Sequence, residues 1–228
     1  KNPRVSYSRH NTSTSGPAIL ERLLAGESCA LVTDAGTPAI SDPGEELVAL
    51  CAQAGVEVVS IPGPCALVAA LAASGQPTGR FTFEGFLAMN KKNRRRHLES
   101  LRGEERTMIF YEAPHKLPAT LADLAETFGP ARPVSLCREL TKLHEEIIRT
   151  TLGEAAERYQ TEPPKGEFVL VVRGAEPREE PEVTLEDGLD RVRALREEEG
   201  LSLRDAVKRA AKELGLSRNE LYRLAVED

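Results

Sequence analysis

The sequence has few aromatic residues and no paired cysteine or histidine motif. Aromatic residues make up 4% of the 228 positions, so little side-chain surface is available for stacking on unpaired bases. The four cysteines are scattered without a C-x-x-C pair, which argues against a zinc site or a disulfide framework. The histidines show no H-x-x-x-H spacing, the pattern that places two metal ligands on one face of a helix. We therefore expect reduced cysteines and no metal site.

The sequence also lacks a long apolar run and an excess of positive charge. The longest apolar segment, residues 65–73, is much shorter than the roughly 20 residues that a membrane helix needs. No export signal opens the chain, so we expect a cytoplasmic protein with no membrane segment. The formal net charge is −6, and any contact with nucleic acid must therefore depend on local basic patches.

Two common nucleotide-binding motifs are absent as well. The sequence contains neither the G-x-G-x-x-G dinucleotide fingerprint nor the G-x-x-x-x-G-K-[ST] phosphate loop. Hydrophobic residues make up 40% of the chain, which is enough for a substantial core. The length suits one large domain or two to three small ones.

The most distinctive stretch is a glycine- and proline-rich loop at residues 33–44, T-D-A-G-T-P-A-I-S-D-P-G. An apolar run at 29–33 predicts a buried strand before this loop, and 43–54 predicts a helix after it. A second strand is expected at 56–61. Strand, helix and strand in this order predict a βαβ unit with parallel strands, and such units bind ligands at the carboxyl ends of their strands.

Individual residues of this loop support a binding role. Gly36 has no Cβ, so a ligand can approach the backbone closely. Asp42 and Glu45 flank Pro43 with the spacing of a capping box, which predicts the start of the following helix. An ordinary connection between a strand and a helix is the alternative interpretation.

Six sequence blocks occur in order along the chain. They are D-A-G-T-P at 34–38, I-S-D-P-G at 40–44, I-P-G-P at 61–64, F-E-G-F at 83–86, F-Y-E-A-P-H at 110–115 and K-G-E-F at 165–168. The series resembles the tetrapyrrole-methylase superfamily, and within it the branch that methylates ribosomal RNA. This resemblance implies transfer of a methyl group from S-adenosyl-L-methionine to a ribose 2′-hydroxyl of a cytidine in the decoding region of 16S ribosomal RNA, in the small ribosomal subunit.

The resemblance covers about residues 1–174 and, more weakly, 184–228. It implies an α/β fold with two α/β lobes, at 1–76 and 77–175, then a linker at 176–183 and a small all-helical, helix-turn-helix-like module at 184–228. Members of this branch are homodimers, and we expect one here. They also carry a further strand, glycine-rich loop and helix ahead of the position of Lys1, so we expect the front end of the first lobe to be missing.

Apolar periodicity and turn residues predict the other elements. Strands are expected at 5–7, 81–87, 106–111, 133–138, 144–150 and 167–172, with 133–138 and 144–150 antiparallel. Helices are expected at 17–25, 65–73, 116–128, 153–160, 184–199, 202–214 and 217–226, and one more runs from the end of the basic run at residue 96 to residue 102. The last three helices of the chain each begin with a side-chain cap followed three residues later by an acid, as in Thr184 and Asp187.

The resemblance places the cofactor against four parts of the chain. The implied residues are Asp34, Ala35, Gly36, Thr37, Ser41, Pro64, Cys65, Ala66, Phe110, Lys165, Gly166, Glu167 and Phe168. Packing in the core is the alternative interpretation for Phe110 and Phe168. The turn at 62–64 could also serve only to start a helix with proline at its first position.

A ribose hydroxyl is a poor nucleophile, so a general base is expected to take its proton. Glu84, Glu112 and Glu139 each lie in or beside a predicted strand end, where functional groups gather in α/β sheets. We choose Glu112 and Glu139 as candidate catalytic residues. The alternative is that these carboxylates accept structural hydrogen bonds.

Two basic patches stand out against the acidic background. One consists of Lys91, Lys92, Arg94, Arg95 and Arg96, and the other of Arg204, Lys208 and Lys212 on one face of a predicted helix. Both predict contacts with RNA phosphates. Charges that are merely solvated are the alternative in each case.

Two other functions stay open at this point. One is a methylase of the same superfamily that acts on a small tetrapyrrole, although such a substrate needs no extended basic patch and no helical tail. The other is a catalytically inactive RNA-binding module, which would not bind the cofactor.

Overall fold

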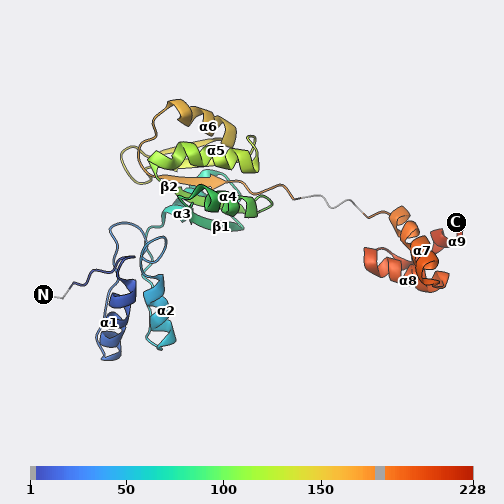
Figure 1. Ribbon diagram of the computed structural model, residues 1–228, viewed down its shortest axis with the longest axis horizontal. Helices are drawn as coiled ribbons and strands as arrows, with labels where there is room; N and C mark the ends of the chain where they lie inside the picture. The colour runs from blue at the N-terminus through green and yellow to red at the C-terminus, as the bar shows by residue number, and fades with distance from the viewer. Residues whose placement is uncertain (1–3, 178–182, 228) are drawn as a thin grey trace. The chain divides into compact units, whose positions relative to one another are not determined.

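The computed structural model describes residues 4–177 and 183–227. The chain divides into two compact units, residues 1–176 and 177–228. The first unit combines helices with a β-sheet, and the second has helices and no strand among its described residues (Figure 1). The predicted α/β class with a C-terminal helical module is therefore confirmed.

A five-stranded mixed sheet forms the centre of the first unit. Its strands are β1 (Phe81–Phe86), β2 (Thr107–Glu112), β3 (Pro133–Arg138), β4 (Glu146–Thr151) and β5 (Phe168–Val172), in the order β1-β2-β5-β3-β4. β1 and β2 are parallel, whereas β5 is antiparallel to both β2 and β3. The predicted antiparallel pairing of the 133–138 and 144–150 segments is confirmed.

The strand directions bring several chain turns to one edge of the sheet. In the register, Phe168 at the start of β5 lies opposite Glu112 and Arg138, at the ends of β2 and β3. Phe86 at the end of β1 pairs with Tyr111. We call this side of the sheet the loop edge, because it collects the carboxyl ends of β1, β2 and β3 and the amino ends of β4 and β5.

The two faces of the sheet carry different helices (Figure 1). Phe110 and Leu170 pack in a core shared with α4 (Lys91–Ser100), α5 (Leu117–Phe128) and α6 (Leu152–Thr161). Their strand neighbours Ile109 and Val169 pack on the opposite face, against α3 (Ala66–Ser74). This division follows the period of two in a strand. A short 3-10 turn, Pro114–Lys116, leads from β2 into α5.

The strands predicted at 5–7, 29–33 and 56–61 are wrong. The structure assigns no strand to these residues, and the side chains of Val32 and Ile61 are 81% and 78% exposed. A strand requires a neighbour for its backbone hydrogen bonds. Within the ranges that the structure describes, no segment pairs with these three in a ladder. Their apolar composition alone therefore does not make them strands.

The first two helices are joined by a small core of their own. α1 (Thr12–Leu24) and α2 (Glu45–Gln53) pack through Ile19, Leu47 and Cys51. α1 begins five residues earlier than predicted, because Asn11 folds the preceding chain: its carboxamide oxygen accepts from Ser8 N at 2.7 Å. Pro17 thus lies inside α1 instead of at its first position.

The capping box predicted for α2 is also wrong. The N-cap of α2 is Gly44, with φ of +146° and no side-chain cap. The Asp42 carboxylate instead accepts a hydrogen bond from Thr33 Oγ1 at 3.1 Å, across the base of the loop. A contact within the loop therefore replaces the local cap.

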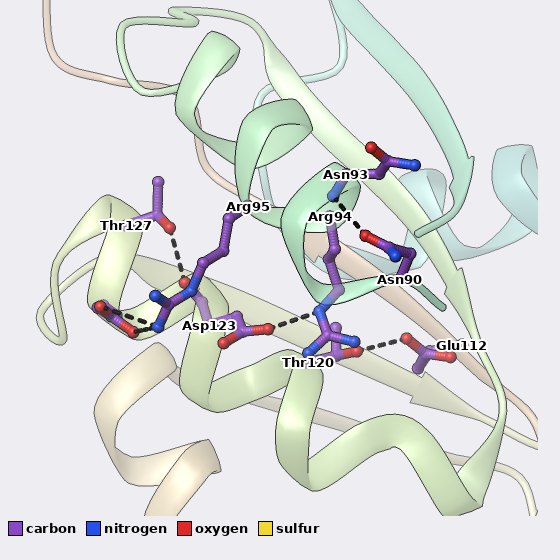
Figure 2. Close-up of polar contacts among 9 residues, drawn as sticks. Asn90, Asn93, Arg94, Arg95, Glu112, Thr120, Asp123 and Thr127 are labelled. Carbon is purple, nitrogen blue, oxygen red and sulfur yellow. Dashed lines mark hydrogen bonds and ion pairs between the residues drawn. The ribbon is translucent and has the colours of Figure 1, made fainter. Parts of the chain in front are cut away.

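The basic run lies within α4, whereas the prediction placed a helix after it. Asn90 is the N-cap, and its side-chain oxygen accepts from Asn93 N at 3.1 Å (Figure 2). An asparagine at this position satisfies one of the free amides of the first turn. The helix therefore begins at Lys91, and helical geometry distributes the five cations around its surface.

The second unit contains α7 (Leu185–Glu199), α8 (Leu203–Leu214) and α9 (Arg218–Glu227). A capping box formed by Thr184 and Asp187 starts α7, as predicted. The core is small and aliphatic, with Val192, Leu195 and Leu221 among its buried residues. Most of the predicted linker, residues 178–182, falls outside the described residues.

The predicted boundary at residue 76 stays a prediction. α3, which precedes it, packs on the sheet that follows it. No helix within the described ranges is both long and apolar enough to cross a membrane.

Candidate functional site

Two loops of the first unit interlock at the loop edge. We call residues 33–44 loop A and residues 61–66 loop B. Thr37 Oγ1 of loop A donates to the carbonyl oxygen of Pro64 in loop B at 2.9 Å. Gly36 has φ of +76°, and a Cβ at this residue would lie 3.8 Å from the same carbonyl. The structure therefore brings together two of the sequence segments predicted to hold a cofactor.

Loop A presents free backbone amides. Over the part of the chain that the structure describes, no hydrogen bond engages the N–H groups of Asp34, Ala35 or Gly36. All three residues are exposed. Arg9 reaches across to the carbonyl oxygen of Ser41 at 3.0 Å and ties down the far end of the loop. A fixed loop with exposed donors is chemically suited to a polar cofactor.

Tyr111 is a residue of this site that the sequence reasoning missed. Its phenol oxygen accepts from the backbone N–H of Leu67 at 3.0 Å, in the first turn of α3 directly after loop B. The ring contacts Phe83 and Phe86 edge-on, with centroids 4.9 and 5.6 Å away. Burial raises the pKa of this phenol, so it stays protonated at neutral pH. Tyr111 thereby links β2 to the start of α3.

A signal for Tyr111 was present in the sequence. Side chains alternate along a strand, so Phe110 and Tyr111 must face opposite sides of the sheet.

Phe110 faces the α5 and α6 side and is fully buried there. Phe168 lies in the same core and packs edge-on against Tyr159. Their side chains thus fit the core-packing interpretation, and a role in cofactor binding would have to involve their backbone.

The loop that precedes β5 is held by the loop that follows β3. The backbone N–H of Glu167 donates to the Glu139 carboxylate at 2.9 Å, and the N–H of Glu139 donates to the carbonyl of Glu167 at 3.0 Å. Lys142 bridges both carboxylates, with two contacts of 2.9 Å. A Cβ at Gly166 would lie 2.3 Å from the Glu139 side chain, so these two loops pack tightly because residue 166 is a glycine.

The two candidate bases have different surroundings. Glu112 is 3% exposed, and its carboxylate accepts from Thr120 Oγ1 at 2.6 Å (Figure 2). It also accepts from Ala113 N at 2.8 Å. These bonds give it a structural role at the start of α5. The pKa of Glu139 is lowered, first by the backbone N–H of Glu167 and then by Lys142. A carboxylate with a lowered pKa is a weaker proton acceptor.

The third glutamate considered, Glu84, lies at an irregularity in β1. The register of β1 on β2 shifts between Phe83 and Gly85, with φ of +63° at Gly85. The Glu84 carboxylate contacts the imidazole of His97 in α4 at 2.8 Å. This pair fastens the last turn of the basic helix to the sheet.

The cations of the basic run fall into two groups. Arg94 Nε contacts Asp123 of α5 at 2.5 Å, and Arg95 contacts Glu126 one turn further along at 3.1 Å (Figure 2). The other members, Lys91, Lys92 and Arg96, are exposed. None of these three has an acidic partner among the described residues. Three cations of the run are therefore free to meet a phosphate.

The basic stripe of the second unit is open as well. Arg204, Lys208 and Lys212 are exposed on α8, and none has an ion-pair partner within the described ranges. The neighbouring Arg209 differs, since it contacts both Glu199 and Glu213. α8 thus carries a stripe of free cations beside a paired one.

The described residues include no group of three or more His, Cys, Asp or Glu side chains that could hold a metal ion. All four cysteines are free thiols. Burial raises the pKa of Cys137 to about 11, so that thiol is not reactive at neutral pH.

Two protein families match this chain. Tetrapyrrole (Corrin/Porphyrin) Methylases match residues 5–156, and the RsmI C-terminal HTH domain matches residues 183–228. The chain is 48% identical over 225 residues to the ribosomal RNA small subunit methyltransferase I of Synechocystis sp., covering 99% of this chain and 80% of that protein. It is 44% identical to the protein of the same name from Halalkalibacterium halodurans, covering 96% of this chain and 76% of that protein.

A solved structure supports the same fold. The crystal structure of the methyltransferase CobJ superposes with a TM-score of 0.54 at 23% identity, over 70% of each chain. The fold is therefore that of the tetrapyrrole methylases, with a helical module added. The chain belongs to the tetrapyrrole methylase family, in the branch formed by its ribosomal RNA small subunit methyltransferase I relatives. The family resemblance inferred from the six sequence blocks is confirmed.

Proposed function

We propose that this protein transfers a methyl group from S-adenosyl-L-methionine to a ribose 2′-hydroxyl of a cytidine in 16S ribosomal RNA. The observation that carries the proposal is the interlocked pair of loops A and B, with free amides at the loop edge, in a chain of this family. The named activity of the relatives and the free cations of α4 support ribosomal RNA as the substrate.

Loops A and B are proposed to hold the cofactor. The exposed N–H groups of Asp34, Ala35 and Gly36 are suitable donors for its polar groups, and Thr37 keeps the two loops in contact. Tyr111 supports loop B from the strand behind it. When bound, the cofactor would supply a methyl group on a sulfonium, whose sulfur leaves as a neutral thioether when an aligned oxygen bonds to the methyl carbon. Much of the protein's task is therefore to align the reacting groups. Rigid loops do this because the reactants lose their translational and rotational freedom on binding, before the reaction itself.

Of the two candidate bases, we favour Glu139. Glu112 is buried and both of its oxygens already accept hydrogen bonds. Glu139 lies in the loop after β3, beside Lys165–Glu167, and its side chain is 18% exposed, whereas Glu112 is buried. Lys142 pairs with Glu139, and its movement toward an RNA phosphate would remove one cause of the lowered pKa of that carboxyl, while the hydrogen bond from the backbone N–H of Glu167 would stay.

The free cations of α4 and the stripe on α8 are proposed to bind RNA phosphates. Such contacts add affinity without reading sequence, in keeping with the small number of aromatic side chains. We further propose that the protein is a homodimer, which sedimentation analysis can test directly.

The function is tested by methyl transfer with isotopically labelled S-adenosyl-L-methionine. Small ribosomal subunits, naked 16S RNA and a tetrapyrrole are offered separately, and modified nucleosides are identified by mass spectrometry. We expect 2′-O-methylcytidine in the ribosomal RNA. Methylation of the tetrapyrrole alone, or of a base in place of a ribose, would contradict the proposal. Absence of cofactor binding by calorimetry would instead indicate an inactive RNA-binding protein.

A further inference from the structure

A cavity at the loop edge has no assigned role. Its volume is about 310 Å³, and its lining comes from the end of β3, from α6 and from the segment that leads into β5. The lining residues are Arg138, Arg158, Tyr159, Glu162, Pro163, Pro164 and Lys165. Three of the seven are cations and one is an acid, so the cavity is suited to an anion.

The guanidinium groups are held in place before any ligand arrives. Arg138 donates from Nε to the carbonyl of Lys165 at 2.8 Å and contacts Glu146 at 3.0 Å. Arg158 lies over the ring of Tyr159, 5.5 Å from its centroid. That ring is buried and packs edge-on against Phe168. Such fixed guanidiniums lose little conformational entropy when they bind a planar or tetrahedral oxyanion.

The acids around the cavity leave part of this positive charge available. Glu162 contacts Arg158 at 2.8 Å, but the Glu162 side chain is 57% exposed, and exposed pairs of this kind are weak. Glu146 lies 3.0 Å from Arg138 and 4.0 Å from Arg158. Lys165 is exposed and its ammonium has no ion-pair partner in the described chain. A phosphate can therefore displace Glu162 and contact the guanidinium groups of Arg138 and Arg158 and the ammonium group of Lys165.

The cavity is separate from loops A and B, although it shares Lys165 with the cofactor residues that the family resemblance implies. Tyr159 belongs to the core on the α5 and α6 face of the sheet. Loop B, by contrast, leads into α3 on the opposite face. Both lie at the loop edge, so a nucleic acid that crosses this edge can touch both.

We propose that this cavity binds a backbone phosphate of the RNA substrate, close to the nucleotide that is methylated. The proposal rests on the proposed function, because it assumes an RNA substrate. It assigns Arg158 to phosphate binding and Glu162 to the role of a competing anion that the RNA phosphate displaces.

Three variants of the full-length chain test this assignment. Arg158→Gln removes a phosphate contact, and Glu162→Gln removes the competitor. Arg22→Gln is the matched control, because Arg22 of α1 forms a similarly exposed ion pair with Glu27. Binding to small ribosomal subunits is measured over a series of salt concentrations, cofactor affinity by calorimetry, and folding by thermal melting.

We expect Arg158→Gln to weaken binding several-fold and to reduce the salt slope by about one. Glu162→Gln should strengthen binding to the subunits. Arg22→Gln should bind the subunits as the wild-type protein does, and all three variants should keep the wild-type cofactor affinity. The proposal is overturned if Arg158→Gln and Arg22→Gln bind alike, or if Arg158→Gln lowers cofactor affinity and leaves RNA binding unchanged. If Arg158→Gln melts early, the Glu162→Gln result decides. Failure of the wild-type protein to bind or methylate the subunits would instead overturn the proposed function itself.

Discussion

Gly36 and Gly55 have nearly the same backbone conformation, with φ of +76° and +72°. Both conformations are unfavourable for residues with a Cβ. A Cβ at Gly55 would meet nothing within 4 Å, whereas Gly36 lies against the Pro64 carbonyl in the interlocked loops. At the scale of single residues, the same geometry therefore occurs once in an open turn and once in the proposed cofactor site.

This pair allows a controlled test of loop A. We expect Gly36→Val and Gly55→Val each to lose roughly 1–2 kcal/mol of stability, because a residue with a Cβ is strained at positive φ. Only Gly36→Val should also lower the affinity for S-adenosyl-L-methionine, by tenfold or more, since its side chain occupies the approach to the loop amides. Calorimetric titration alongside a thermal melt makes the comparison. Equal cofactor affinity in the two folded variants would remove loop A from the site.

At the scale of elements, α4 combines a structural face with a free one. Arg94 and Asp123 are 15% and 11% exposed, so this ion pair lies between α4 and α5. Leu98 on the same helix is fully buried in the core. Lys91, Lys92 and Arg96 project into solvent. The helical period thus separates residues that fasten the helix from residues that can meet RNA.

Two single substitutions separate these faces. Arg94→Ala leaves the Asp123 carboxylate without its partner, so we expect it to cost roughly 1–3 kcal/mol of stability. It should leave the salt dependence of RNA binding unchanged. Arg96→Ala should change stability by less than about 0.5 kcal/mol and reduce the salt slope by about one. Urea unfolding and RNA titrations at several salt concentrations measure both effects. The reverse pattern would show that Arg94 contacts RNA and that Arg96 is structural.

At the scale of the whole molecule, the chain is two compact units. The second has its own core, in which Leu195 and Leu221 are fully buried. Each of its first two helices begins with a side-chain cap, Thr184 or Ser202. A small module with its own core and caps can fold without the rest of the chain. Its free cations on α8 are then available to dock on the ribosomal particle.

Deletion of residues 180–228 tests that role. The truncated protein should keep its cofactor affinity, because loops A and B lie wholly in the first unit, and the proposed dimer should persist. Methylation of small ribosomal subunits should fall by roughly 10²-fold, since a tethered second contact raises the effective concentration of the first. A full-length variant with Arg204, Lys208 and Lys212 changed to Gln should show most of the same loss. Full activity of the truncated protein on the particles would exclude recognition by the module.

The sequence by itself determined the elements whose signals are local. Apolar runs bounded by turn residues predicted all five strands of the sheet to within two residues. The Thr184 capping box and the glycine stops predicted the helices of the second unit. The six ordered blocks determined the family, because they occur together and in one order along the chain.

Only the tertiary structure decided what depends on distant partners. Val32 and Ile61 have strand-like neighbours in the sequence, but a strand also needs a ladder, and none forms at these positions within the described ranges. Arg94 and Arg96 look alike in a basic run. Their roles diverge because Arg94 contacts Asp123, which lies 29 residues further along the sequence. The role of Tyr111 likewise depends on its hydrogen bond with the backbone N–H of Leu67, 44 residues earlier. Long-range contacts of this kind leave no periodic signal, and only the folded chain brings them together.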